Sequence, residues 1–278
     1  MILTHERAGR GETVVLVHGL GSARTTWKPV TPALSACFDV IAVDLPGHGR
    51  TPWVKGTAMD PRSLAASVVD TLDSLGVQRK VHLVGNSLGG WTCLELAAAH
   101  PERVASIVAL APAGMRETPL AKIGLDFKIN RYLSVAARPL LPFLLGNERL
   151  RAIGFAQNSP VWKQWSLETC RDAADAMALS GGYHAALDGI LGRLADCTKK
   201  IPASIPLTIV FGDTDVILPP STSQSRRHLP AHARWLDWER CGHAVQLDYP
   251  ERVVELVKEV ALATATPRAT ATARDRPA

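Results

Sequence analysis

Long apolar runs are missing from this sequence. The most apolar stretch, residues 140–145, contains Pro142 and is far shorter than the roughly 20 residues that a membrane-spanning helix needs. The first seven residues carry no apolar core of the kind found in a secretory signal. We therefore expect a cytoplasmic protein that makes no contact with a membrane.

Blocks of like charge are also missing. The formal net charge is +5, of which Arg268, Arg274 and Arg276 together with Asp275 contribute +2 at the end of the chain. The remaining excess of +3 is too small to indicate a nucleic-acid-binding surface. We expect no nucleic-acid partner, and the sequence does not indicate an oligomeric state.

Several cofactor and metal motifs are absent as well. The five cysteines are odd in number, widely spaced and contain no CxxC pair, which favours reduced thiols in the cytoplasm. No Walker A sequence and no HExxH occur, which argues against a P-loop nucleotide site and a zinc protease. We expect no metal and no organic cofactor.

What the sequence does contain is a series of short, β-branched apolar runs. Continuous apolar runs of this length are typical of strands that are buried on both faces of a parallel sheet. The runs cover residues 14–17, 40–43, 81–84, 104–110 and 207–211, with a weaker one at 233–238. Helical patterns lie between them at residues 63–75, 87–99 and 251–262. This alternation predicts an α/β fold with a doubly wound, mostly parallel sheet.

The alternation breaks between residues 115 and 203, where helical signals and prolines occur without a clear strand. We interpret this segment as a helical cap inserted into a core made of residues 1–114 and 204–262. Its aromatic and leucine-rich composition favours an apolar small-molecule substrate. Residues 263–278 lack an apolar face and are predicted to form a disordered tail.

One pentapeptide carries a candidate nucleophile. Residues 85–89 match G-x-S-x-G, follow a predicted buried strand and open a predicted helix. The turn between this strand and this helix is so tight that Gly85 and Gly89 are needed to avoid collisions of Cβ atoms with neighbouring backbone. This setting would expose the hydroxyl of Ser87 above the sheet, although an ordinary N-cap serine is the alternative.

A serine hydroxyl needs a base and a group that orients the base. Asp213 and Asp215 follow the fifth predicted strand, and His243 follows the last one. All three sit just beyond the carboxyl end of a strand, where open α/β sheets build their sites. Either aspartate could serve as the orienting acid.

Five segments together resemble the α/β-hydrolase family over nearly the whole chain. They are His18-Gly19-Leu20-Gly21, Asp44-Leu45-Pro46-Gly47-His48-Gly49, residues 85–90, the loop from Gly212 through Asp215 to Pro219, and Gly242-His243. The resemblance implies a Ser87–Asp215–His243 triad and favours Asp215 over Asp213. It also implies an oxyanion hole formed by the backbone N–H groups of Leu20 and Leu88. His18 and His48 are structural in most relatives.

The resemblance leaves the bond that is cleaved open. We expect a carboxylic ester hydrolase that forms an acyl-enzyme on Ser87. Carbon–carbon hydrolases of ring-cleavage products share the elbow but have a tryptophan after the histidine, where this chain has Ala244. Perhydrolases share the triad, and some proteins with this fold are ligand receptors. A dinucleotide site is a further alternative, because Gly19, Gly21 and Asp44 mimic a Rossmann fingerprint, but Arg24 stands at the third glycine position.

Overall fold

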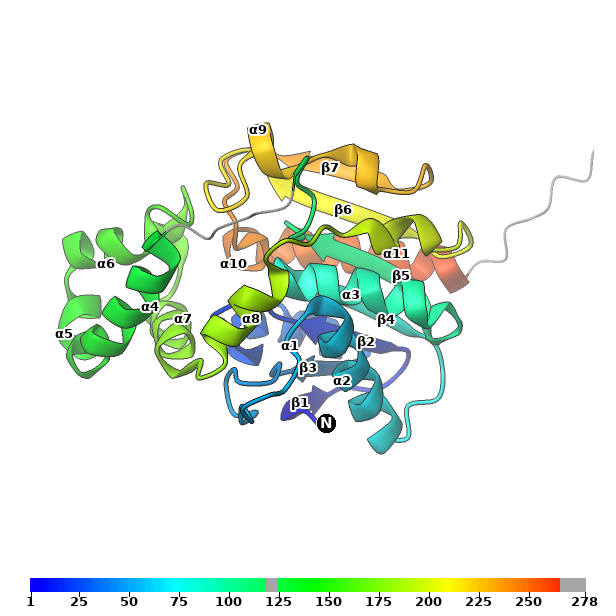
Figure 1. Ribbon diagram of the computed structural model, residues 1–278, viewed down its shortest axis with the longest axis horizontal. Helices are drawn as coiled ribbons and strands as arrows, with labels where there is room; N and C mark the ends of the chain where they lie inside the picture. The colour runs from blue at the N-terminus through cyan, green and yellow to red at the C-terminus, as the bar shows by residue number, and fades with distance from the viewer. Residues whose placement is uncertain (119–124, 266–278) are drawn as a thin grey trace, which may run out of the picture.

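The computed structural model describes residues 1–118 and 125–265 (Figure 1). In this part of the chain seven strands form one sheet in the order β1-β3-β2-β4-β5-β6-β7. The strands are β1 His5–Ala8, β2 Thr13–Val17, β3 Asp39–Val43, β4 Val81–Asn86, β5 Val104–Leu110, β6 Leu207–Gly212 and β7 Arg234–Trp238. Every neighbouring pair is parallel except β1 with β3. The predicted mostly parallel α/β sheet is confirmed.

β1 is the strand that the sequence pattern did not predict. It reads His-Glu-Arg-Ala and is mostly exposed, because it forms the antiparallel edge of the sheet. An edge strand has only one neighbour and does not need two apolar faces. The central strands β2, β3 and β4 are buried throughout, as their β-branched runs predict.

Helices cover both faces of the sheet (Figure 1). α2 and α3 pack together on one face, where α3 contacts β4 and β5, and α11 packs against β5 from the other face beside α1. The helices of this core are α1 Thr31–Ser35, α2 Pro61–Ser74, α3 Leu88–Ala99, α9 Pro220–Ser223, α10 Val245–Asp248 and α11 Pro250–Ala265. α11 continues three residues into the segment predicted to be a tail, and residues 266–278 lie outside the described residues.

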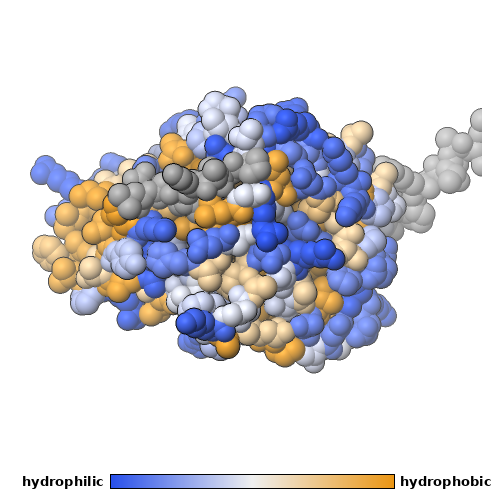
Figure 2. Space-filling view, in the orientation of Figure 1, coloured by the Kyte–Doolittle hydropathy of each residue, from blue (hydrophilic) through white to orange (hydrophobic). Residues whose placement is uncertain are grey.

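Among the described residues, five α-helices lie between β5 and β6 in the chain, and we call this segment the insertion. They are α4 Leu125–Ala137, α5 Leu141–Gly146, α6 Glu148–Phe155, α7 Leu167–Leu179 and α8 Tyr183–Ile190. Figure 1 shows α4 to α7 gathered in a lobe at one end of the molecule. The lobe has a small apolar cluster of its own, formed by Leu141, Leu145, Phe155, Trp162 and Cys170. Figure 2 shows that apolar side chains also gather on its surface.

The insertion also contacts loops at the carboxyl edge of the sheet. A Cβ atom on Gly21 would lie 2.7 Å from the sulfur of Met177 on α7. The N–H of Gly182, just before α8, donates to the carbonyl oxygen of Gly47 at 2.9 Å. None of the helices among residues 1–118 and 125–265 is both long and apolar enough to cross a membrane.

Candidate active site

Ser87 occupies a strained turn between β4 and α3. Its φ of 54° and ψ of −117° lie in a region that side-chain-bearing residues rarely adopt. Backbone hydrogen bonds hold the turn: the N–H of Ser87 donates to the carbonyl oxygen of Leu110 at 2.9 Å, and its own carbonyl accepts from Trp91 and Ala113. Such strain persists because the surrounding structure over-determines the turn, and it lifts the serine side chain off the sheet.

The glycines on either side of Ser87 are required by close backbone approach. A Cβ atom on Gly85 would lie 2.4 Å from the carbonyl oxygen of Gly89. A Cβ atom on Gly89 would lie 2.2 Å from the carbonyl oxygen of Val17 on β2. No real Cβ atom approaches backbone so closely, so these two positions tolerate only glycine while the elbow keeps its shape.

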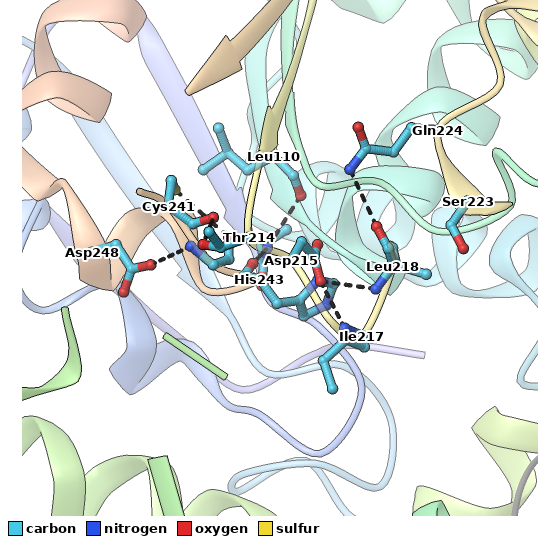
Figure 3. Close-up of polar contacts among 12 residues, drawn as sticks. Leu110, Thr214, Asp215, Ile217, Leu218, Ser223, Gln224, Cys241, His243 and Asp248 are labelled. Atoms are coloured by element: carbon cyan, nitrogen blue, oxygen red, sulfur yellow. Dashed lines mark hydrogen bonds and ion pairs between the residues drawn. The ribbon is translucent and has the colours of Figure 1, made fainter. Parts of the chain in front are cut away.

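Asp215 and His243 come together although 27 residues separate them in the sequence (Figure 3). Oδ2 of Asp215 lies 2.7 Å from Nδ1 of His243, and Oδ1 of Asp215 accepts the N–H groups of Ile217 at 2.9 Å and Leu218 at 2.8 Å. Asp215 is only 2% exposed, whereas the imidazole of His243 is 15% exposed. The carboxylate therefore fixes one ring nitrogen and leaves Nε2 as the nitrogen available for chemistry.

The pKa of Asp215 is lowered below its ordinary value. Burial acts to raise the pKa of this carboxyl, but the nearby His243 and the two backbone N–H donors outweigh that effect. The carboxyl group is thus a stable anion, which is the state that can stabilise an imidazolium.

Asp213, the rival acid, faces elsewhere. It is exposed, and its Oδ1 accepts the backbone N–H of Cys241 at 3.3 Å. Its role in the structure is thus to hold the loop that precedes His243.

Both backbone polar groups of His243 are hydrogen-bonded. Its carbonyl oxygen accepts a hydrogen bond from Nδ2 of Asn86 at 3.0 Å, and its N–H donates to the carbonyl oxygen of Asn158 in the insertion at 3.1 Å. Sequence reasoning missed both contacts. Asn86 is the variable residue before Ser87 in the pentapeptide, and this position is a sequence signal that its side chain lies near the site. Asn158 gives no such signal, because it contacts His243 through its backbone carbonyl.

The predicted oxyanion loop lies beside the elbow. A Cβ atom on Gly19 would lie 3.1 Å from Cβ of Ser87, so the loop of residues 18–21 lies against the turn that carries Ser87. Leu20 is the third residue of that loop. Leu88 is the first residue of α3, so the N–H of Leu88 has no hydrogen-bond partner within the helix. The N–H groups of Leu20 and Leu88 remain predicted oxyanion donors.

His18 and His48 are fully buried and hydrogen-bonded to backbone. In His18, Nδ1 lies 2.7 Å from the carbonyl oxygen of Gly19, and Nε2 accepts the N–H of Leu45 at 3.0 Å. Burial lowers the pKa of both imidazoles, to about 3 in His48. With both ring nitrogens of His18 engaged and both rings kept neutral, these residues support the loops around the site.

Asp44 and Arg24, which figured in the dinucleotide alternative, bind each other. Asp44 is fully buried and accepts the guanidinium of Arg24 as well as the backbone N–H groups of Arg24 and Arg50. Its carboxylate oxygens therefore already have partners, which removes the acid needed for a ribose. Among residues 1–118 and 125–265, no group of three or more His, Cys, Asp or Glu side chains is placed to hold a metal ion.

Comparison with known proteins places this chain in a family. A model described as "Alpha/beta hydrolase family" matches residues 14–256. The chain belongs to the alpha/beta hydrolase family. It is 28% identical over 274 residues to a pimeloyl-[acyl-carrier protein] methyl ester esterase from Aeromonas hydrophila, covering 93% of this chain and 98% of that protein. The predicted family and the predicted hydrolase are thus confirmed.

Two further similarities show the range of this alpha/beta hydrolase's relatives. A 2-hydroxy-6-oxo-6-phenylhexa-2,4-dienoate hydrolase from Comamonas testosteroni is 32% identical over 137 residues, which are 46% of this chain and 48% of that protein. The solved structure of a thermophilic esterase from Thermogutta terrifontis superposes with a TM-score of 0.70 at 24% identity, covering 95% of this chain and 94% of that one. At that identity the superposition shows the fold alone.

Proposed function

We propose that this alpha/beta hydrolase cleaves carboxylic esters through an acyl-enzyme on Ser87, with His243 as base and Asp215 as orienting acid. The observation that carries the proposal is the part-buried 2.7 Å contact between Asp215 and His243. The same loop is held close to Ser87, because the carbonyl oxygen of His243 accepts a hydrogen bond from Asn86, the residue before Ser87.

The chemistry follows from these groups. His243 takes the proton of the Ser87 hydroxyl at Nε2 while the oxygen attacks the ester carbonyl, and the imidazolium then protonates the departing alcohol. Water, deprotonated by the same nitrogen, attacks the acyl carbon; the bond from that carbon to Oγ of Ser87 breaks, and the imidazolium returns its proton to Oγ as the acid leaves. The N–H groups of Leu20 and Leu88 are the proposed donors to the oxyanion. Each such donor is typically worth about 10²–10³ in rate.

The insertion is proposed to act as a cap that selects the substrate. Its own apolar cluster and its contact with Gly21 support a separate unit, residues 115–203, over a core of residues 1–114 and 204–262. Exposed apolar side chains concentrate on it, among them Tyr132, Leu133 and Phe143. These support an apolar acyl group as the preferred small-molecule substrate. A cytoplasmic location is proposed as well, supported by the five cysteines, none of which forms a disulfide.

Carbon–carbon bond hydrolysis is the second candidate. It is supported by the partial similarity to the dienoate hydrolase, whereas the relative matched over nearly its full length is named as an ester hydrolase. Ala244 stands after the histidine, where carbon–carbon hydrolases have a tryptophan, and this difference favours ester hydrolysis.

The test combines labelling with a substrate series. The wild-type protein should react with a fluorophosphonate and hydrolyse p-nitrophenyl esters, with kcat/KM rising with acyl length, and should turn over vinylogous 1,5-diketones poorly. Ser87→Ala should lose labelling and turnover. Ser74→Ala, which alters an exposed serine at the end of α2, should keep both. Ser87→Ala with most of its activity would refute the mechanism, and diketones as the preferred substrates would favour carbon–carbon cleavage.

A further inference from the structure

A second carboxylate, Asp248, lies behind the histidine loop and is unused by the mechanism above. It is the last residue of α10 and is only 4% exposed. Its Oδ2 accepts the N–H of Gly242 at 2.7 Å, and its Oδ1 accepts the indole N–H of Trp165 at 3.1 Å. Figure 3 shows Asp248 reaching the loop that carries His243. One buried side chain therefore joins the residue before His243 to the insertion.

The hydrogen-bond donors around Asp248 only partly offset its burial, and the pKa of this carboxyl is raised above its ordinary value. Burial raises the pKa of Asp248, and hydrogen bonds from the hydroxyl of Ser159, the N–H of Gly242 and the indole of Trp165 act against that rise. Two of these three donors, Ser159 and Trp165, belong to the insertion. A buried carboxylate that loses a donor is left with an unsatisfied acceptor, which is costly. Each donor therefore strongly favours the present position of the Asp248 side chain.

The same stretch of the insertion also contacts the histidine loop directly through Asn158. The carbonyl oxygen of Asn158 accepts the N–H of His243, and a Cβ atom on Gly242 would lie only 2.2 Å from that oxygen. Trp165 is in turn packed against Phe155 of the lobe's apolar cluster, with ring centroids 5.7 Å apart. Because these contacts are close, a displacement of Asn158 or of the Trp165 ring should displace the histidine loop as well.

We propose that Asp248 and Trp165 are positioning residues, through which the insertion sets the placement of the catalytic histidine. The inference rests on the proposed function, since it assigns His243 the role of base. The backbone of His243 is then fixed on one side by Asn86, beside the nucleophile, and on the other side by the insertion. The insertion completes the catalytic geometry as well as covering the substrate.

The test compares two tryptophans of the insertion. Trp165→Phe removes the indole donor to Asp248 and keeps an aromatic ring. Trp162→Phe is the matched control, because Trp162 is buried in the same apolar cluster, whereas the indole N–H that donates to Asp248 is that of Trp165. Asp248→Asn keeps the size of the side chain and removes one acceptor. Thermal unfolding identifies any variant that does not fold, and if Asp248→Asn fails, Trp165→Phe decides alone.

For Trp165→Phe we expect kcat to fall by about tenfold with little change in KM, the scale of one buried hydrogen bond or a small misplacement of a catalytic group. The rate of labelling by a small fluorophosphonate should fall in parallel, because phosphonylation needs the same base but no acyl pocket. Trp162→Phe should keep both rates. Wild-type rates in Trp165→Phe, or an equal loss in Trp162→Phe, would overturn the inference. If Ser87→Ala in the same series also stays active, the proposed function itself is wrong.

Discussion

The carboxylate of Asp215 uses both of its oxygens in the structure. Oδ2 faces Nδ1 of His243 at 2.7 Å, while Oδ1 accepts two backbone N–H groups of its own loop. The loop thus holds the carboxylate in one orientation before a substrate arrives. This preorganisation separates Asp215 from Asp213, which is exposed and bonded to the backbone of Cys241.

Asp215→Asn should lower kcat by about 10⁴, because an amide in this place favours the wrong tautomer of the histidine. Asp213→Asn is the control and should keep kcat close to the wild-type value, since the amide oxygen of asparagine can still accept the N–H of Cys241. Steady-state hydrolysis of a p-nitrophenyl ester measures both. The reverse ranking would transfer the role of acid to Asp213.

Gly89→Ala should destabilise the protein by at least about 3 kcal/mol or prevent folding, because the new Cβ meets the backbone of β2. Gly154→Ala is the matched change, since Gly154 also lies in a helix but nothing is within 4 Å of its added Cβ. It should stabilise the protein by about 0.5–1 kcal/mol through the better helix propensity of alanine. Urea denaturation measures both; a well-folded Gly89→Ala protein would contradict the packing of the elbow.

His48 should make the protein sensitive to mild acid. Its pKa is lowered to about 3 in the folded protein, mainly by burial, against about 6.5 in an unfolded chain. Only the unfolded state then binds the proton between these values, so this stability is fully present above pH 6.5 and is lost progressively as the pH falls towards 3. Between pH 7 and pH 5 the loss from this group should be about 2 kcal/mol.

His48→Asn isolates that effect, since an amide can still donate to the carbonyl of Pro46, which Nδ1 of His48 contacts at 2.9 Å. The variant should be less stable at pH 7, but its free energy of unfolding should change less between pH 7 and pH 5. Equal losses in the two proteins, measured by urea denaturation, would show that His48 is already protonated in the folded state or does not contribute.

Asp44→Ala should cost about 3–5 kcal/mol, because it leaves the buried guanidinium of Arg24 and two backbone N–H groups without their acceptor. Glu6→Ala removes the other partner of Arg24, at 2.9 Å, but Glu6 is 61% exposed and should cost less than about 1 kcal/mol. Chemical denaturation compares the two. A small effect of Asp44→Ala would revive a ligand-binding role for this aspartate.

Most of the fold could be predicted because its signals are local. A strand buried on both faces must be continuously apolar, so β2, β3 and β4 were visible in the sequence. β1 was missed because an exposed edge strand imposes no such pattern. The strained elbow was equally visible, since Gly85 and Gly89 lie within two residues of Ser87 and the collisions they avoid are imposed by the turn itself.

The sequence by itself determined the order and chemistry of the candidate groups: a serine on a tight turn, then acids, then a histidine, each after a strand. The family resemblance already favoured Asp215 over Asp213, but only the tertiary structure shows that Asp215 contacts His243 while Asp213 binds the backbone of Cys241. The tertiary structure alone showed that Asp44 is occupied by Arg24, and that the insertion holds the histidine loop through Asn158 and Trp165. The physical reason is that these contacts join segments far apart in the chain, and several act through backbone atoms that every residue carries.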